Sequence, residues 1–370
     1  MHGDPGEAES KLILLRRRSK IVEITCADDL VFALSLSGVC AAFQGNERIA
    51  YLNTTAGEVI RSLYFNKANG SLITVSVYRD ENFASLRCRS TPLEYIRRRQ
   101  PAAGFALFEG ECLKWPGFVE FDDVNSKVLT YSAAAHTYSV WEMRSYGLIY
   151  RISDERVTEI KISPKAMLII KEREASFVPL RILSIEDGTQ VKALSHPLHR
   201  TRKVELIELF DEKLLVKQEC ASMQIVDVKT GATIHVPASE FLAPAAFIFL
   251  YNQRRFLTFR HRSVAIWNFR GECVTAFDDH TLWHPDSNMN NIFITTTQDY
   301  IISYCKRPEG DERKGGTINI SSLLTGKCVG KVAQGEPLHE LQDVTTLYYN
   351  EQRNALYLGD RNGILRVLAQ

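Results

Sequence analysis

One pattern recurs eight times along the chain: an apolar alternating strand that ends in a polar or acidic residue, often with a glycine soon after. The central residues of the copies lie at positions 43, 88, 141, 183, 226, 267, 321 and 367, so successive copies are 45, 53, 42, 43, 41, 54 and 46 residues apart. A period of about 40–45 residues is typical of four-stranded propeller blades. Because the strands are short and long helical periodicity is absent, we predict an all-β fold, a single closed β-propeller of eight blades.

The two longest intervals contain segments that interrupt the repeat. Residues 91–104 are rich in proline and arginine, and residues 307–316 are charged and contain glycine, so we predict insertions at both places. The last copy is followed by no fourth strand, whereas Lys11–Arg16 form a spare strand near the start. We therefore predict a flexible tail over residues 1–10 and one domain over residues 11–370, whose last blade is completed by the N-terminal strand. Seven blades are the alternative if the weak copy at Cys88 belongs to an irregular neighbour.

Two copies of the pattern carry a tryptophan in a characteristic position. Val140-Trp141-Glu142 and Ile266-Trp267-Asn268 resemble the apolar-Trp-acidic or amide ending of the third strand in the WD-repeat family. Asp360-Arg361-Asn362-Gly363 resembles the tight turn before that strand, and the whole pattern is similar to divergent plant proteins of WD-repeat type. The resemblance implies that His339, at the place of the family's Gly-His dipeptide, bonds Asp360. We expect Trp141 and Trp267 to pack in the core between blades.

Composition and motifs favour a binding protein over an enzyme. The 45 Lys and Arg residues almost balance the 44 Asp and Glu residues, so we expect no nucleic-acid partner. No catalytic signature is present, no Cys-x-x-Cys pair indicates zinc, and we predict neither metal nor other cofactor. The chain has no signal-type N-terminus and no apolar stretch long enough for a membrane helix, so we expect a cytoplasmic or nuclear protein. We predict a non-enzymatic scaffold that binds other proteins, within a multi-subunit complex, through loops on the propeller rim.

Candidate partner-binding residues lie in loops rich in aromatic or basic side chains. Trp115, Trp283 and His284 fall in predicted connections between blades, where a large aromatic side chain is suited to anchor a partner. The alternative is that each tryptophan fills a gap between blades. Arg97, Arg98 and Arg99 lie in the first insertion, which we expect to protrude. The insertion is either a tolerated loop, which is the favoured interpretation, or a surface that docks an acidic partner or RNA.

Two further functions stay open at this stage. Some WD-repeat proteins are substrate receptors of cullin-RING ubiquitin ligases and bind the ligase adaptor through a Trp-Asp-x-Arg ending. Two segments resemble that ending, with Trp141 and Arg144 in one and Trp267 and Arg270 in the other. Their second residues are Glu142 and Asn268, not Asp, which departs from the family pattern. The third alternative is a hydrolase with its site in the mouth of the channel.

Overall fold

The computed structural model describes residues 8–13, 19–109, 111, 113–114, 117–260, 263–277, 291–306, 316–332, 341 and 344–369. The described residues form eight antiparallel sheets of four strands each, and these are the blades of an eight-bladed β-propeller. Each of the eight repeat positions falls in the third strand of its sheet, so the predicted fold class is confirmed and the seven-bladed alternative is wrong. Contacts divide the chain into two compact units, which are described separately.

The first unit holds the first two and the last two sheets, with a short helix. The first sheet consists of β2 (Ile21–Ala27), β3 (Leu30–Ser35), β4 (Cys40–Gln44) and β5 (Glu47–Tyr51). The second consists of β6 (Glu58–Asn66), β7 (Ser71–Tyr78), β8 (Arg87–Pro92) and β9 (Phe105–Leu107). The seventh consists of β26 (Ile292–Ile294), β27 (Tyr300–Lys306), β28 (Gly316–Ser322) and β29 (Cys328–Val332). The eighth consists of β30 (Val344–Asn350), β31 (Ala355–Asp360), β32 (Ile364–Ala369) and β1 (Ala8–Ile13).

The second unit holds the third, fourth and fifth sheets and most of the sixth. The third consists of β10 (Phe118–Asp122), β11 (Lys127–Ser132), β12 (Thr137–Glu142) and β13 (Leu148–Ser153). The fourth consists of β14 (Val157–Ser163), β15 (Ala166–Lys171), β16 (Phe177–Ser184) and β17 (Gln190–Pro197). The fifth consists of β18 (Val204–Phe210), β19 (Lys213–Gln218), β20 (Met223–Asp227) and β21 (Thr233–Val236). The sixth consists of β22 (Ala246–Leu250), β23 (Arg255–Arg260), β24 (Ser263–Asn268) and β25 (Cys273–Ala276).

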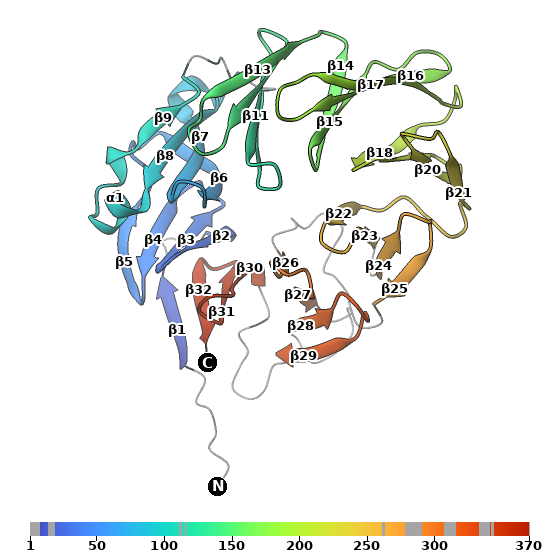
Figure 1. The fold of residues 1–370 in the computed structure, drawn as a ribbon. Coiled ribbons are helices and arrows are strands. Elements are labelled where there is room, and N and C mark those ends of the chain that lie inside the picture. The colour runs from blue at the N-terminus through green and yellow to red at the C-terminus, as the bar shows by residue number, and fades with distance from the viewer. Residues whose placement is uncertain are drawn as a thin grey trace. The chain divides into compact units, whose positions relative to one another are not determined.

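The N-terminal strand completes the last sheet, as predicted. Strand β1, blue in Figure 1, runs antiparallel to β32, red, and pairs Ala8 with Ala369 and Ile13 with Ile364. The strand thus begins at Ala8 and not at the predicted Lys11, so it includes three residues of the expected tail. The pairing hydrogen-bonds one edge of β32 that would otherwise be exposed.

The recurring glycine of the sequence pattern makes the turn between the third and fourth strands. Gly231 and Gly271 have φ of 78° and 81°, a left-handed conformation that costs glycine little because it has no Cβ. The preceding polar residue holds the turn: Asp227 Oδ1 accepts from the backbone N–H of Thr230 at 2.8 Å. The pattern therefore predicts the third strand of a sheet, the turn after it and the fourth strand that follows.

The first insertion forms ordered structure and does not simply protrude. Its first residues end strand β8, and helix α1 (Leu93–Arg97) and the 3-10 helix η2 (Pro101–Ala103) follow. Another 3-10 helix, η1 (Arg79–Glu81), lies outside the insertion and follows β7. Leu93 and Ile96 of α1 are buried in an apolar cluster with residues of the first and second sheets. The second predicted insertion, residues 307–316, lies outside the described residues except for Gly316 in β28. Among the described residues, no helix has the length and apolar character to cross a membrane.

Candidate interaction site

The two motif tryptophans share one local bond but differ in burial. The indole N–H of Trp141 donates to Thr130 Oγ1 at 2.9 Å, and that of Trp267 donates to Thr258 Oγ1 at 3.0 Å. In both cases the threonine lies on the second strand beside the tryptophan's third strand. Trp267 is buried and stacks on Phe256, which confirms its place in the core, whereas Trp141 is only half-buried.

The arginines that follow these tryptophans lie in exposed turns. Glu142 Oε2 accepts from the backbone N–H of Ser145 at 2.6 Å, and Asn268 Oδ1 accepts from the backbone N–H of Arg270 at 2.9 Å. Glu142 and Asn268 thus stabilise their turns in the same way, by accepting a hydrogen bond from the backbone, although neither is the aspartate of the family pattern. Arg144 and Arg270 are exposed beside these fixed turns.

Asp360 lies at the end of β31 and bonds both a side chain and the backbone of the following turn and strand. Its Oδ2 lies 2.8 Å from Arg366 Nη1, and its Oδ1 accepts from the backbone N–H groups of Asn362 and Ile364. It therefore fixes the turn between β31 and β32. Its predicted partner His339 lies outside the described residues, as do Trp115, Trp283 and His284.

The three arginines of the insertion pair with carboxylates of the chain itself. Arg97 Nε and Nη2 lie 3.0 and 2.7 Å from Asp29 Oδ1, and Nη2 lies 3.0 Å from Asp28 Oδ2. Burial raises the pKa of Asp29, but the hydrogen bonds from Arg97 and Gln44 outweigh it, so that pKa falls below its usual value. The bond to Asp29 raises the pKa of Arg97.

Arg98 and Arg99 are more exposed than Arg97 and form single ion pairs, with Glu94 and Glu47. These internal pairs offset the positive charge that an acidic partner would need to meet. Arg98 and Arg99 are exposed and Arg97 is half-buried, so a partner could reach them, and docking on these three arginines stays a prediction.

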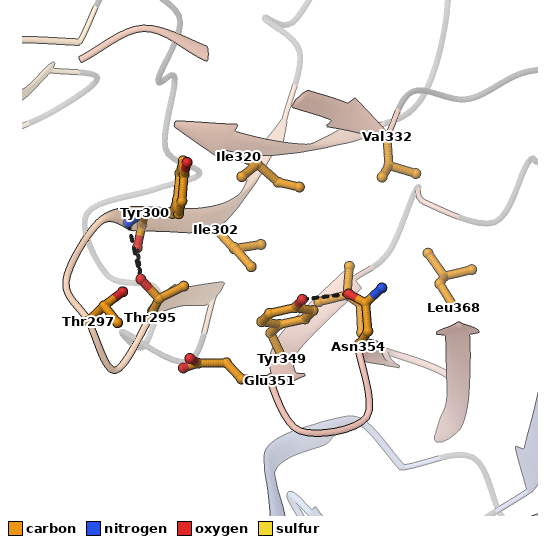
Figure 2. A pocket seen from close by; sticks show the side chains of 11 residues that line it. Thr295, Thr297, Tyr300, Ile302, Ile320, Val332, Tyr349, Glu351, Asn354 and Leu368 are labelled. Carbon is orange, nitrogen blue, oxygen red and sulfur yellow. Dashed lines mark hydrogen bonds between the residues drawn. The ribbon is translucent and has the colours of Figure 1, made fainter. Parts of the chain in front are cut away.

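A groove that the sequence pattern did not indicate lies between the seventh and eighth sheets. It has a volume of about 510 Å³, within the range of ligand pockets. Figure 2 shows Ile302, Ile320 and Val332 on one side and Tyr349 and Leu368 on the other. Leu356 also lines it. Ile302 and Leu356 are buried members of the apolar cluster that also contains Tyr304 and Leu347. The other apolar lining residues are only partly buried and pack against this cluster, so the apolar contact between the two sheets continues into the groove.

Polar side chains from two neighbouring turns form the rim of this groove. Thr295 and Thr297 come from the turn between β26 and β27, and Tyr300 is the first residue of β27. Glu351 and Asn354 come from the turn between β30 and β31. Glu351 Oε1 accepts from the backbone N–H of Thr296 at 2.7 Å and from its hydroxyl at 2.9 Å, which ties the two turns together. The Tyr349 hydroxyl donates to Asn354 Oδ1 at 2.6 Å.

These hydrogen bonds hold the rim in place, and Glu351 carries the one carboxyl group among the lining residues. Tyr300 is 43% exposed, a large ring at the edge of an apolar surface. An apolar floor with a fixed polar edge is suited to take an aliphatic side chain and to bond the backbone that carries it.

A second pocket, between the fourth and fifth sheets, has a volume of about 490 Å³ and a charged lining. Lys161 Nζ lies 2.7 Å from Glu159 Oε1 and 3.0 Å from Glu208 Oε1. Burial raises the pKa of Glu208, with Lys161 acting against it. Arg173 donates to the carbonyl groups of His199, Arg200 and Arg202. Because these charged side chains already pair within the protein, a partner would have to compete with those pairs in this pocket, which the apolar groove does not require.

Within the described ranges, no group of three or more His, Cys, Asp or Glu side chains is placed to hold a metal ion. The described cysteines are free thiols, and burial raises the pKa of the Cys26 and Cys88 thiols to about 12. Buried thiols with such pKa values are unreactive core residues.

Comparison with known proteins supports the fold and adds a family. A family model described as a domain of unknown function (DUF7899) matches residues 1–368. The crystal structure of the computationally designed Ika8 protein is similar, with 14% identity, a TM-score of 0.56, and coverage of 97% of this chain and 99% of that one. The crystal structure of BamB from Moraxella catarrhalis has 14% identity, a TM-score of 0.49 and coverage of 98% of both chains. No curated protein matches the sequence. At 14% identity the likeness to Ika8 shows the fold alone, and the WD-repeat resemblance stays a prediction.

Proposed function

Since the chain belongs to the family described as a domain of unknown function (DUF7899), we propose its role from the molecule itself: a non-enzymatic scaffold that binds other proteins, in the cytoplasm or the nucleus. The propeller fold is compatible with such a role because its strands form rigid sheets and its turns can vary without loss of the fold.

The observation that carries this proposal is the apolar groove between the seventh and eighth sheets. Its walls include the half-buried apolar side chains of Ile320, Val332 and Leu368. Apolar surface that stays open to solvent is typical of sites that bind another protein. Glu351 and Thr296 hold its rim, so a partner need not order that rim on binding.

Affinity purification from native cells, followed by mass spectrometry, tests this role. We expect a small, reproducible set of proteins enriched over a mock purification, and we expect the purified chain to turn over none of a panel of ester, phosphate and glycoside substrates. An empty set of partners, or specific turnover, contradicts the proposal.

A second candidate function is the ubiquitin-ligase substrate receptor. The observation that favours it is the shared geometry of the two Trp-x-x-Arg endings, in which a fixed turn leaves Arg144 and Arg270 exposed. The test is a pull-down of the propeller adaptor with the wild type and with the Arg144→Ala/Arg270→Ala double mutant. Binding by the wild type alone supports this function, and no binding by the wild type removes it.

A further inference from the structure

The groove between the seventh and eighth sheets has a filled counterpart between the first and second. There, helix α1 follows the third strand β8 and contacts β5 of the neighbouring sheet. Its Leu93 and Ile96, three positions apart, are 3% and 0% exposed, and they share one apolar cluster with Leu72 of β7. Two aliphatic side chains from one helical turn therefore cover that surface.

The two places correspond residue by residue. Leu72 and Leu356 are each the second residue of the second strand of their sheet. Leu72 pairs with Thr91 on the third strand, and Leu356 pairs with Leu368 on the third strand. In the second sheet the connection that follows Thr91 is α1. In the eighth sheet the third strand β32 pairs with β1, a strand far away in sequence, and none of the described residues forms a helix like α1 between these two strands.

The charge beside each place corresponds too. Asp29, which Arg97 of α1 binds, directly precedes the second strand of the first sheet. Asp299 directly precedes the second strand of the seventh sheet and is exposed, and no hydrogen bond or ion pair joins its carboxylate to another described residue. Asp299 does not line the groove itself but lies in the same turn as the rim residues Thr295 and Thr297, opposite the turn of Glu351. The two turns of the rim thus carry two carboxylates, and the described lining residues include no Lys or Arg.

We propose that this groove binds one helical turn of a partner protein that carries two aliphatic side chains three positions apart, followed directly by an arginine. This inference rests on the scaffold role proposed above and names the class of partner. The aliphatic pair fills the space between Val332 and Leu368, as Leu93 and Ile96 fill its counterpart, and the arginine meets Asp299. Helix-in-groove recognition of this type places its anchors at positions i and i+3.

The chain itself supplies the probe. A fluorescein-labelled peptide with the sequence of residues 91–99, Thr-Pro-Leu-Glu-Tyr-Ile-Arg-Arg-Arg, is titrated with the full-length protein by fluorescence polarisation. We expect saturable binding below about 1 mM, the weak range suited to one helical turn. A control peptide with serine in place of both aliphatic residues is expected not to saturate.

Variants then locate the binding. Val332→Lys places a cation in the groove and is expected to weaken binding at least tenfold. Val329→Lys is the matched control, because Val329 lies on the same strand, is 60% exposed and does not line the groove. Asp299→Lys, at an exposed position, is expected to weaken binding about tenfold, and it keeps the test decisive if Val332→Lys does not fold.

Absence of saturable binding to the wild type would overturn the proposal. Equal weakening by Val329→Lys, Val332→Lys and Asp299→Lys would overturn it too. Sedimentation velocity at the same concentrations checks for a second copy: a dimer that Asp299→Lys dissociates assigns the groove to self-association and also overturns it. The scaffold role is judged separately. Native partners that bind the wild type and the groove variants alike leave that role intact while the groove proposal fails.

Discussion

Arg97 holds Asp29 with two donors, Nε at 3.0 Å and Nη2 at 2.7 Å from one carboxylate oxygen, across 68 positions of sequence. The contact fastens helix α1 to the turn between β2 and β3. Beside it, Ile96 is fully buried, so the helix is held both by an ion pair and by apolar burial. The two contributions differ in size, and mutation separates them.

Ile96→Ala is expected to lower the free energy of unfolding by about 2–4 kcal/mol, because it leaves a cavity beneath α1. Arg97→Ala is expected to lower it by about 1 kcal/mol or less, because the pair is screened by solvent at its roughly one-third exposed side chains. Urea unfolding of both variants measures the difference. A larger loss for Arg97→Ala than for Ile96→Ala would mean that the ion pair, not the apolar contact, docks the helix.

Trp267→Ala is expected to cost about 3–5 kcal/mol, since the side chain is buried and stacked on Phe256. Trp141→Ala is expected to cost less, since its ring is half-buried although its bond to Thr130 matches that of Trp267 to Thr258. Thermal melting of the two variants ranks them, and the reverse ranking would contradict burial as the cause of the difference.

Asp360→Ala is expected to lower the free energy of unfolding by about 3–5 kcal/mol, because it leaves the Arg366 guanidinium buried without its carboxylate. Asp360→Asn keeps an oxygen for the backbone N–H groups of Asn362 and Ile364 and is expected to cost less. Chemical unfolding compares the two. Equal losses would assign the role of Asp360 to its charge alone.

Glu23 is expected to make stability depend on pH. Burial raises the pKa of Glu23 to about 7, against the hydrogen bond that its Oε1 accepts from the backbone N–H of Leu63. Because the folded pKa lies above the usual 4.5, the folded state binds the proton more tightly. The resulting stabilisation is complete below pH 4.5 and is lost as pH rises through 7. The loss is at most about 3 kcal/mol.

Glu23→Gln keeps the acceptor oxygen and removes the titration. We expect this variant to be more stable than the wild type at pH 8 and similar to it at pH 4.5. Urea unfolding at both values gives the comparison, in which the other titrating groups cancel. A constant difference across this range would show that Glu23 does not titrate there.

Much of the fold could be predicted from the sequence because each blade repeats its own local chemistry. The third strands follow from the turn after them, in which a polar side chain such as Asp227 bonds the backbone and Gly231 takes positive φ. The completion of the last sheet by the N-terminal strand could also be predicted, because the eighth copy of the pattern has no fourth strand after it. Strand β1 begins three residues earlier than Lys11, since Ala8 still pairs with Ala369.

The site could not be predicted in the same way. Helix α1 has five residues, too few for a periodic pattern, and its partners Asp28 and Asp29 lie far away in sequence. No helix like α1 covers the groove among the described residues, and the lining residues are ordinary strand and turn residues. Only a comparison of equivalent positions, Leu72 with Leu356 and Asp29 with Asp299, indicates it.

We expect this propeller to bind its partners at the groove between the seventh and eighth sheets. Site-specific photocrosslinking in native cells tests that contact directly, with the crosslinker at Thr297 on the exposed rim or at Val329 on the same sheet away from it. We predict protein adducts from position 297 that are absent from position 329, with the attached partner segment carrying aliphatic residues three apart and an arginine. Equal adducts from both positions, or none from position 297, would contradict the account.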